Sequence, residues 1–251
     1  MGTVVKARRM TKTKHPSGAP WRNFYGRFRG KTIRASQHDY LENDLAPLSP
    51  GPISWDENPD RVPLDLSGVF GDKDIWLEIG FGGGEHLAGL AATMPDSDFI
   101  GAEPFINGVA SLLRHIQEQQ LGNIRIWPDD VRLIMPSLGA ASLAGAFIMF
   151  PDPWPKKRHA ARRILQTALL DQLAVMIRPG GRLVLASDDS TAKSWLLQAA
   201  TAHADFMWTA RGPEDWRQRP AELPETRYMK KADRANRRSS WFLFQRCKFA
   251  A

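Results

Sequence analysis

Short apolar runs alternate with segments of helical spacing from residue 74 onward, and no other feature of the sequence constrains the fold as strongly. The apolar runs have the length of buried strands and lie at 74–80, 98–103, 123–127, 145–150 and 182–187. The helical segments lie at 85–93, 107–121, 130–138, 162–178 and 191–203, the fourth closed by Pro179-Gly180-Gly181. Strict alternation predicts a doubly wound, mostly parallel α/β sheet. Two last strands, at 206–209 and 240–246 with a long basic loop between them, predict an antiparallel strand near the C-terminus.

Residues 1–66 lack this alternation and differ in charge from the rest of the chain. The first 34 residues contain ten Lys or Arg and no acidic residue, in a chain of 251 residues and net charge +7. We interpret residues 1–66 as a basic arm and linker, partly disordered and with a short helix over 39–45, and residues 67–251 as one folded domain. With two further basic clusters, at 156–163 and 227–238, the arm favours a polyanionic partner, because phosphates reward each well-placed cation. For the first twenty residues, a solubilising tail is an equal alternative.

The composition excludes several classes of site and location. The single cysteine, Cys247, excludes an internal disulfide and a Cys-rich zinc site. The six histidines are scattered, so no metal is expected. No apolar run reaches the roughly 18 residues that span a bilayer, and the N-terminus lacks the apolar stretch of a signal peptide. We therefore expect a cytoplasmic protein without membrane contact, either monomeric or a weak homodimer.

A glycine loop follows the first strand, and acids close the next two strands. Gly80 and Gly82 let the backbone turn sharply and approach a ligand at a helix N-terminus. Glu85 stands where a dinucleotide fingerprint needs Gly or Ala, and its charge would repel a pyrophosphate. A nucleoside cofactor without phosphates, such as S-adenosylmethionine, fits this loop. Glu103 can accept both ribose hydroxyls of S-adenosylmethionine or of NAD, and Asp130 can accept the adenine amine or cap a helix.

The fourth strand ends in an unusual segment, Phe150-Pro151-Asp152-Pro153-Trp154-Pro155. Three prolines in five residues fix the backbone and hold Asp152 and Trp154 at the carboxyl edge of the sheet. Five cations follow within residues 156–163. This combination indicates a rigid acceptor site with phosphate-binding residues beside it. Trp154 either stacks on a base or packs over the loop.

This segment resembles the signature of the tRNA (guanine-N7-)-methyltransferase family, a Rossmann-like class I methyltransferase group. The similarity extends to residues 78–87, 101–103, 186–188 and 226–228, and to the arm at 24–30. It implies that residues 67–251 form an S-adenosylmethionine-dependent methyltransferase domain, which methylates N7 of a guanine in the tRNA variable loop. The implied cofactor contacts are Glu78, Glu103, Asp130 and Asp152. The implied acceptor contacts are Lys156, Asp188, Thr226, Arg227, Tyr228 and Met229, and the implied RNA contacts are Arg158, His159, Arg162 and Arg163.

The chemistry of the acceptor makes Asp152 the candidate catalytic residue. Guanine N7 carries a lone pair and no proton, so positioning and charge stabilisation matter more than a general base. Asp152, and after it Asp188, can accept from the donor edge of guanine. Met229 stands where the family has Glu. Either the remaining acids suffice, or Glu225 takes this place, or Met229 points into the core.

Other functions are weighed against this one. A class I methyltransferase could act on another RNA or on a substrate that is not a nucleic acid, although the basic clusters argue against the latter. A non-enzymatic RNA-binding protein on the same fold is favoured only by Met229. An NAD oxidoreductase is disfavoured by Glu85.

Overall fold

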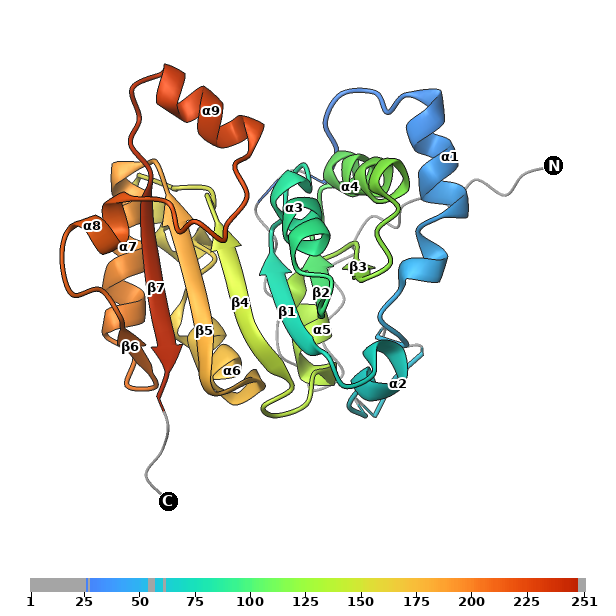
Figure 1. The fold of residues 1–251 in the computed structure, drawn as a ribbon, viewed down its shortest axis with the longest axis horizontal. Helices are drawn as coiled ribbons and strands as arrows, with labels where there is room; N and C mark the ends of the chain where they lie inside the picture. Colours follow the sequence, from blue (N-terminus) through green and yellow to red (C-terminus); the bar gives the residue numbers. More distant parts are fainter. Residues whose placement is uncertain (1–25, 27, 54–56, 61, 248–251) are drawn as a thin grey trace.

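The computed structural model describes residues 26, 28–53, 57–60 and 62–247. Within them, one seven-stranded sheet has the order β3-β2-β1-β4-β5-β7-β6 (Figure 1). The strands β1 to β5 pair in parallel, and β7 runs antiparallel to both β5 and β6. This arrangement confirms the predicted α/β sheet with one antiparallel strand. The strands are β1 (Asp74–Ile79), β2 (Ser97–Ala102), β3 (Ile124–Trp127), β4 (Leu143–Met149), β5 (Ile177–Ser187), β6 (Phe206–Trp208) and β7 (Ser240–Arg246).

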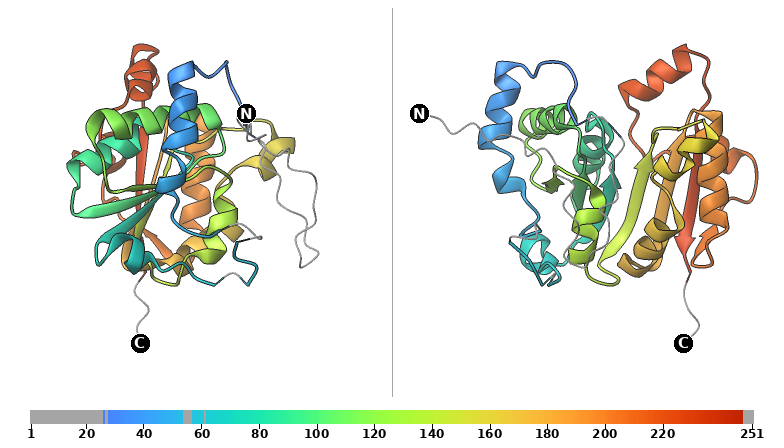
Figure 2. Two further views of the ribbon diagram at one scale, coloured as in Figure 1. Left: turned by 90° about the vertical axis from the view of Figure 1, so that its right-hand side faces the viewer. Right: turned by 180° about the vertical axis from the view of Figure 1, so that it is seen from behind.

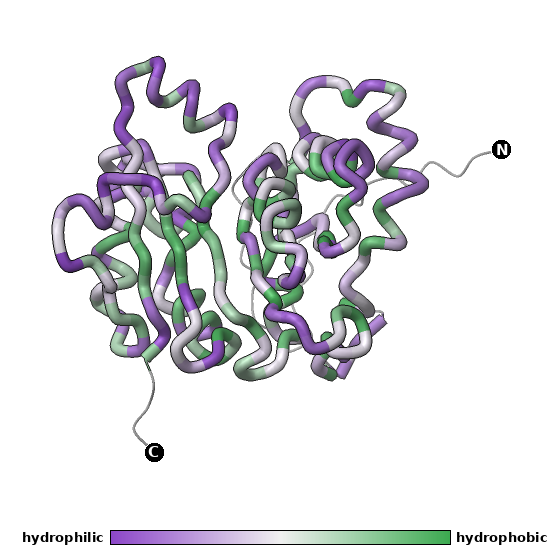
Figure 3. Tube along the Cα trace, in the orientation of Figure 1, coloured by the Kyte–Doolittle hydropathy of each residue, from purple (hydrophilic) through white to green (hydrophobic). Residues whose placement is uncertain are grey.

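Helices cover both faces of the sheet, as the views from the side and from behind show (Figure 2). On one face, α3 (Glu85–Thr93) and α4 (Ile106–Gln119) enclose an apolar cluster. On the other, α2 (Leu66–Phe70), α5 (Val131–Ile134), α6 (Thr167–Met176) and α7 (Ser190–Thr201) enclose a second. Both clusters contain side chains of the central strands, because successive side chains of a strand point to opposite faces of the sheet. Apolar residues accordingly concentrate along the strands in Figure 3.

The structure corrects the expected elements in three places. The loop expected between β6 and β7 contains two helices, α8 (Glu214–Arg217) and α9 (Arg227–Arg234), and Thr226 caps α9 by accepting from Met229 N–H. The helix expected over 162–178 begins only at Thr167, after a 3-10 helix, η3 (Lys157–Arg162). Pro179-Gly180-Gly181 lies within β5, whose Ile177 already pairs with Leu143 of β4.

The described part of the arm lies against α4. The Phe28 carbonyl accepts a hydrogen bond from Ile106 N–H at 3.1 Å. Asn107 Oδ1 accepts from Gly30 N–H at 2.7 Å, and Asn107 Nδ2 donates to the Lys31 carbonyl at 2.7 Å. The helix expected over 39–45 is α1 (Ala35–Asn43), which packs beside α4 (Figure 1) and is followed by η1 (Ala46–Leu48). Residues 1–25 of the segment predicted to be partly disordered lie outside the described residues.

Candidate cofactor and acceptor site

A cavity of about 770 Å³ opens at the carboxyl ends of β1, β2 and β4. In this sheet the chain order reverses between β1 and β4, and such a switch point is where doubly wound sheets bind ligands. The helix η2 (Met135–Ser137) follows α5. Five predicted cofactor residues line the cavity, namely Gly80, Gly82, Glu103, Asp130 and Asp152, together with Gly26 of the arm, Phe105, Arg132, Phe150, Trp154 and Arg162.

The glycine loop is bonded to the carboxylate of Glu103. Gly80 and Gly82 have φ of +74° and +55°, a region that favours glycine, and a side chain at either would meet open space. Gly82 N–H donates to Glu103 Oε2 at 2.7 Å, and Phe105 N–H donates to Oε1 at 2.9 Å. Burial raises the pKa of Glu103, whereas these two hydrogen bonds lower it. The charges of Glu78 and Asp152 raise it further. The loop thus holds a buried carboxylate at the cavity wall.

Glu78 is 1% exposed, lies on β1 just before the glycine loop, and is outside the set of residues that line the cavity. Its Oε2 lies 3.0 Å from Nδ1 of His86, and the His86 ring contacts Phe147 edge-on at 5.3 Å. No local sequence pattern indicates this pairing, because His86 is on α3 and Glu78 is on β1. Its contact with the cofactor stays a prediction.

Asp130 has the capping role that its sequence position allowed, and its contact with adenine stays a prediction. It caps α5, since its Oδ1 accepts from Arg132 N–H at 3.0 Å, and it lines the cavity. The Arg132 guanidinium also forms an ion pair with its carboxylate. Arg132 lines the cavity as well and is a residue that the sequence analysis missed. The neighbouring Asp129 has a pKa that burial raises.

The segment Phe150–Pro155, here called the site loop, has a strained backbone. Phe150 and Trp154 have φ of +50° and +39°, where L-residues with large side chains are uncommon. Each such residue costs on the order of 1–3 kcal/mol and persists only where its surroundings hold it. Asp152, between them, is exposed at the mouth of the cavity and makes no hydrogen bond to a residue that the structure describes. The loop therefore presents a free carboxylate from a rigid backbone.

Cations surround the indole of Trp154. The Arg162 guanidinium lies 5.0 Å from the ring centroid, and His159 meets the ring edge-on at 5.7 Å. Desolvation lowers the pKa of His159, and the charges of Arg162, Arg158 and Lys156 lower it further. Along the predicted RNA-contact segment, Lys156 and Arg158 are exposed, whereas His159, Arg162 and Arg163 are half-buried.

The predicted acceptor residues on α9 meet the end of β5. Tyr228 Oη donates to Asp188 Oδ1 at 3.1 Å, and the tyrosine ring packs on Phe150 of the site loop at 5.0 Å. Burial raises the pKa of Tyr228, as do the charge of Asp188 and the hydrogen bond to it. Arg237 forms an ion pair with Asp188, at 2.8 Å between Nε and Oδ2. Asp188, Tyr228 and the site loop are thereby brought together.

Met229 is 4% exposed and packs in the cluster shared with α3 and α4. Its side chain therefore points into the core, the third of the outcomes considered from the sequence. Glu225 forms an ion pair with Lys230 at 3.1 Å and does not replace a carboxylate at this position. A contact between the acceptor and residue 229 would have to use the backbone, and it stays a prediction.

Glu85 has a role that the sequence did not indicate. Its Oε2 accepts from Arg227 N–H at 2.7 Å, and its Oε1 forms an ion pair with the Arg227 guanidinium. The first residue of α3 thus anchors the first residue of α9, although 142 positions separate them. Pro224 would collide with any side chain at Gly89, which places this segment close against α3.

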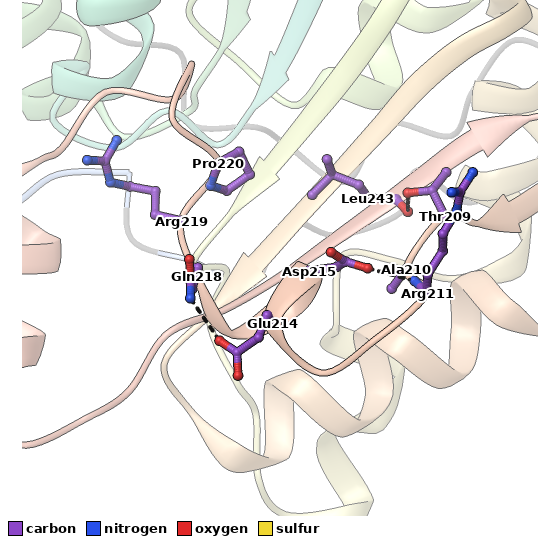
Figure 4. A pocket seen from close by; sticks show the side chains of 9 residues that line it. All are labelled: Thr209, Ala210, Arg211, Glu214, Asp215, Gln218, Arg219, Pro220 and Leu243. Atoms are coloured by element: carbon purple, nitrogen blue, oxygen red, sulfur yellow. Dashed lines mark hydrogen bonds between the residues drawn. The ribbon is translucent and has the colours of Figure 1, made fainter.

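A second cavity, of about 480 Å³, lies between α8 and the β6–β7 pair (Figure 4). Its acids are bonded within the protein: Asp215 accepts from Arg211 and Gly212 N–H, and Glu214 accepts from Gln218. The two backbone bonds lower the pKa of Asp215. No predicted site residue lines this cavity. The first cavity is therefore the candidate site.

Two kinds of feature are absent from the described residues. None of their helices is long and apolar enough to cross a membrane. In the same part of the chain, no group of three or more His, Cys, Asp or Glu side chains could hold a metal ion.

Known proteins resemble this chain over most of its length. The model of a family described as putative methyltransferase matches residues 72–241. The tRNA (guanine-N(7)-)-methyltransferase of Ruegeria sp. (strain TM1040) is 47% identical over 233 residues, covering 93% of this chain and 91% of that relative. The protein of the same name from Roseobacter denitrificans is 48% identical, covering 90% of this chain and 97% of the relative.

Solved structures support the fold independently. The 16S rRNA methyltransferase KamB superposes with a TM-score of 0.51 at 14% identity, covering 73% of this chain and 93% of that one. At this identity the likeness concerns the fold alone. The relatives share nearly half of their residues with this chain over almost its whole length, and the signature of the site loop lies within the matched region. The chain belongs to the tRNA (guanine-N7-)-methyltransferase family.

Proposed function

We propose that this protein transfers a methyl group from S-adenosylmethionine to N7 of a guanine in the variable loop of tRNA. The observation that supports this most directly is the site loop, in which the exposed carboxylate of Asp152 lies beside a cavity of about 770 Å³ and is followed in the sequence by a row of cations. Relatives named for this activity match over most of the chain. A methyltransferase acting on a small molecule or a protein would have no use for three basic clusters.

The residues at the cavity fit S-adenosylmethionine. The open space above Gly80, Gly82 and Gly83 lets a ligand approach the backbone closely. Glu103 keeps lone pairs for the ribose hydroxyls, because a carboxylate offers about four acceptor positions and two are used. In this proposal Asp130, which lines the cavity, accepts the adenine amine beside its bonds to Arg132. When bound, S-adenosylmethionine supplies an electrophilic methyl group on its sulfonium.

The protein's own work in this reaction is positioning and charge stabilisation. No residue needs to remove a proton first, since guanine N7 has a free lone pair. Asp152 can accept from guanine N1–H and the 2-amino group and so hold N7 in line with the methyl group. The same carboxylate offsets the positive charge that develops on the base. In this proposal Asp188, held by Tyr228 and Arg237, contacts the acceptor from the β5 side.

The RNA must be held while its base leaves the stack to enter the site. Exposed cations occur at η3, which follows the site loop, and on α9, whose Tyr228 packs on Phe150. They include Lys156, Arg158, Lys231 and Arg234. Phosphate contacts of this kind position an RNA without reading its sequence.

The test is mass spectrometry of nucleosides from tRNA incubated with the protein and S-adenosylmethionine. We expect 7-methylguanosine among the nucleosides of a tRNA that lacks it beforehand, and none when the protein is omitted; mass spectrometry of oligonucleotide fragments then locates it in the variable loop. A methylated nucleoside other than 7-methylguanosine, or methyl transfer confined to a substrate that is not a nucleic acid, would overturn the proposal. Calorimetric titration with S-adenosylhomocysteine separates an inactive RNA-binding protein from an enzyme given the wrong substrate.

A further inference from the structure

Arg163 ends the basic segment 156–163, yet its guanidinium lies behind the site loop. Arg163 Nη2 donates to the Trp154 carbonyl at 3.3 Å. Its guanidinium carbon lies 5.9 Å from the ring centroid of Trp195, a residue of α7 that is 6% exposed. Its Nε is fully buried. Arg158, by contrast, is exposed. Arg163 therefore spans the space between the site loop and α7.

The site loop needs such a support because it has few backbone donors. Pro151, Pro153 and Pro155 have no N–H group, so half of its residues cannot donate a backbone hydrogen bond. The Phe150 N–H donates to the Ala186 carbonyl at 2.8 Å and fixes the start of the loop. At the other end, Trp154 has positive φ, and its carbonyl is the atom that Arg163 holds. Asp152 lies between these two fixed points.

We propose that Arg163 is a positioning residue for methyl transfer and does not bind RNA. It sets the backbone of Trp154, and through it the place of Asp152 at the mouth of the cavity. A planar guanidinium suits this role, since it donates in a fixed direction while its face packs on an indole. The inference rests on the proposed function for the identity of the reaction. The contacts from which we infer the role of Arg163 lie entirely within this chain.

The experiment compares Arg163→Gln with the matched variant Arg158→Gln, which removes an exposed cation five positions away. Arg163→Lys retains the positive charge but not the planar fork, and it serves as the second variant if Arg163→Gln does not fold. For each protein, three quantities are measured: kcat at saturating tRNA and cofactor, the salt dependence of tRNA binding, and the Kd for S-adenosylhomocysteine by calorimetry. Thermal unfolding confirms that each variant is folded.

Both Arg163 variants should lose roughly 10- to 100-fold in kcat, the size expected when a reacting group is misplaced by about 1 Å. Their Kd for S-adenosylhomocysteine should rise about fivefold or more, because Asp152 and Trp154 line the cavity. Their salt slope should stay that of the parent, whereas Arg158→Gln should flatten it and leave S-adenosylhomocysteine binding unchanged. An unchanged affinity for S-adenosylhomocysteine, or a salt slope as flat as that of Arg158→Gln, would overturn the inference. Because this ligand is bound without turnover, the result stands apart from whether tRNA is the substrate.

Discussion

The carboxylates of the site differ in burial and in hydrogen bonding. Glu103 is buried and held by two backbone N–H groups, whereas Asp152 is exposed at the cavity mouth without such partners. A buried carboxylate with fixed donors suits a permanent contact with the cofactor. An exposed one with free lone pairs suits a base that arrives and leaves. The two residues should therefore respond differently to substitution and to pH.

Acidification should weaken cofactor binding through Glu103. Burial raises its pKa, so it gains a proton at a higher pH than an ordinary glutamate and then has fewer lone pairs for the ribose hydroxyls. The sign for folding is the opposite: a raised pKa in the folded state means that protonating Glu103 favours the fold. Loss of affinity on acidification, with the protein still folded, is thus the expected result. Calorimetric titrations with S-adenosylhomocysteine over a pH series measure it.

Glu103→Gln is the control for this pH dependence. The variant should bind S-adenosylhomocysteine more weakly by about 1.5–3 kcal/mol, the range for a hydrogen bond to a charged group. Its affinity should change less with pH than that of the parent. Equal pH dependence in the two proteins would show that another group titrates.

Asp152→Asn should lower turnover far more than tRNA affinity. The substitution replaces one acceptor oxygen by an NH₂ donor that faces the donor edge of guanine. We expect kcat to fall at least about tenfold, which corresponds to about 1.4 kcal/mol of transition-state stabilisation, with the tRNA Kd within about twofold. Asp171→Asn, on the exposed side of α6, should leave both quantities unchanged. A turnover within twofold of the parent would mean that another carboxylate holds the base.

At the scale of elements, α9 is the part of the site least determined by its own sequence. It has eight residues, two of them buried, and is placed by contacts with distant elements. Glu85 of α3 holds Arg227 at its start, and Asp188 after β5 holds Tyr228. An isolated helix of this length is marginal in water, so these contacts determine whether it forms.

Glu85→Ala should loosen α9 without unfolding the domain. The variant removes both an ion pair and the acceptor for Arg227 N–H. Trypsin should then cleave the segment 227–234 several times faster, because that segment offers four basic residues to the protease once it opens. Limited proteolysis followed by mass spectrometry locates the cuts.

Glu225→Ala is the matched control for this measurement. It removes an exposed ion pair with Lys230 in the same segment, and exposed pairs contribute little to stability. Equal cleavage rates in the two variants would show that Glu85 does not anchor α9.

An element can be predicted from the sequence when the pattern that specifies it lies within its own residues. The strands and α3 show their pattern of apolar residues within their own segments, and the predicted bounds of α3, 85–93, are those observed. The residues that close β2 and β3, and the site loop after β4, likewise follow from the order of elements, since parallel strands end at one edge. The contacts of α9 with Glu85 and Asp188 join residues far apart along the chain. The pair of Glu78 with His86 and the bond from Arg163 to Trp154 join residues only eight and nine positions apart, but they depend on how the chain turns between consecutive elements. No local pattern specifies them.

At the scale of the whole molecule, the basic arm and the cofactor cavity are joined. Gly26 lines the cavity, and Asn107 at the start of α4 holds the backbone of Gly30 and Lys31 by two hydrogen bonds. A side chain at Gly30 would collide with Phe105, which itself lines the cavity and donates to Glu103. The arm thus contributes to the wall of the cavity as well as to the charge of the molecule.

Two truncations should separate these contributions. Residues 1–25 contain six Lys or Arg, whereas the part of the arm that is bonded to Asn107 lies at residues 30 and 31. Removing residues 1–25 should flatten the salt dependence of tRNA binding, by roughly 0.7–0.9 in the logarithmic slope for each phosphate that is no longer neutralised. Affinity for S-adenosylhomocysteine should stay that of the parent. Removing residues 1–34 takes away the segment bound to Asn107 and should weaken both ligands.

The substitution Asn107→Ala completes this comparison, because it releases the arm without deleting a charge. It removes the acceptor of Gly30 N–H and the donor to the Lys31 carbonyl, so S-adenosylhomocysteine should bind more weakly while the salt slope of tRNA binding stays unchanged. Calorimetry and filter binding across a salt series give the two quantities. If both truncations and Asn107→Ala left S-adenosylhomocysteine affinity unchanged, the arm would act on RNA alone. If removing residues 1–25 left the salt slope unchanged, that segment would be a solubilising tail and the RNA would be held by η3 and α9.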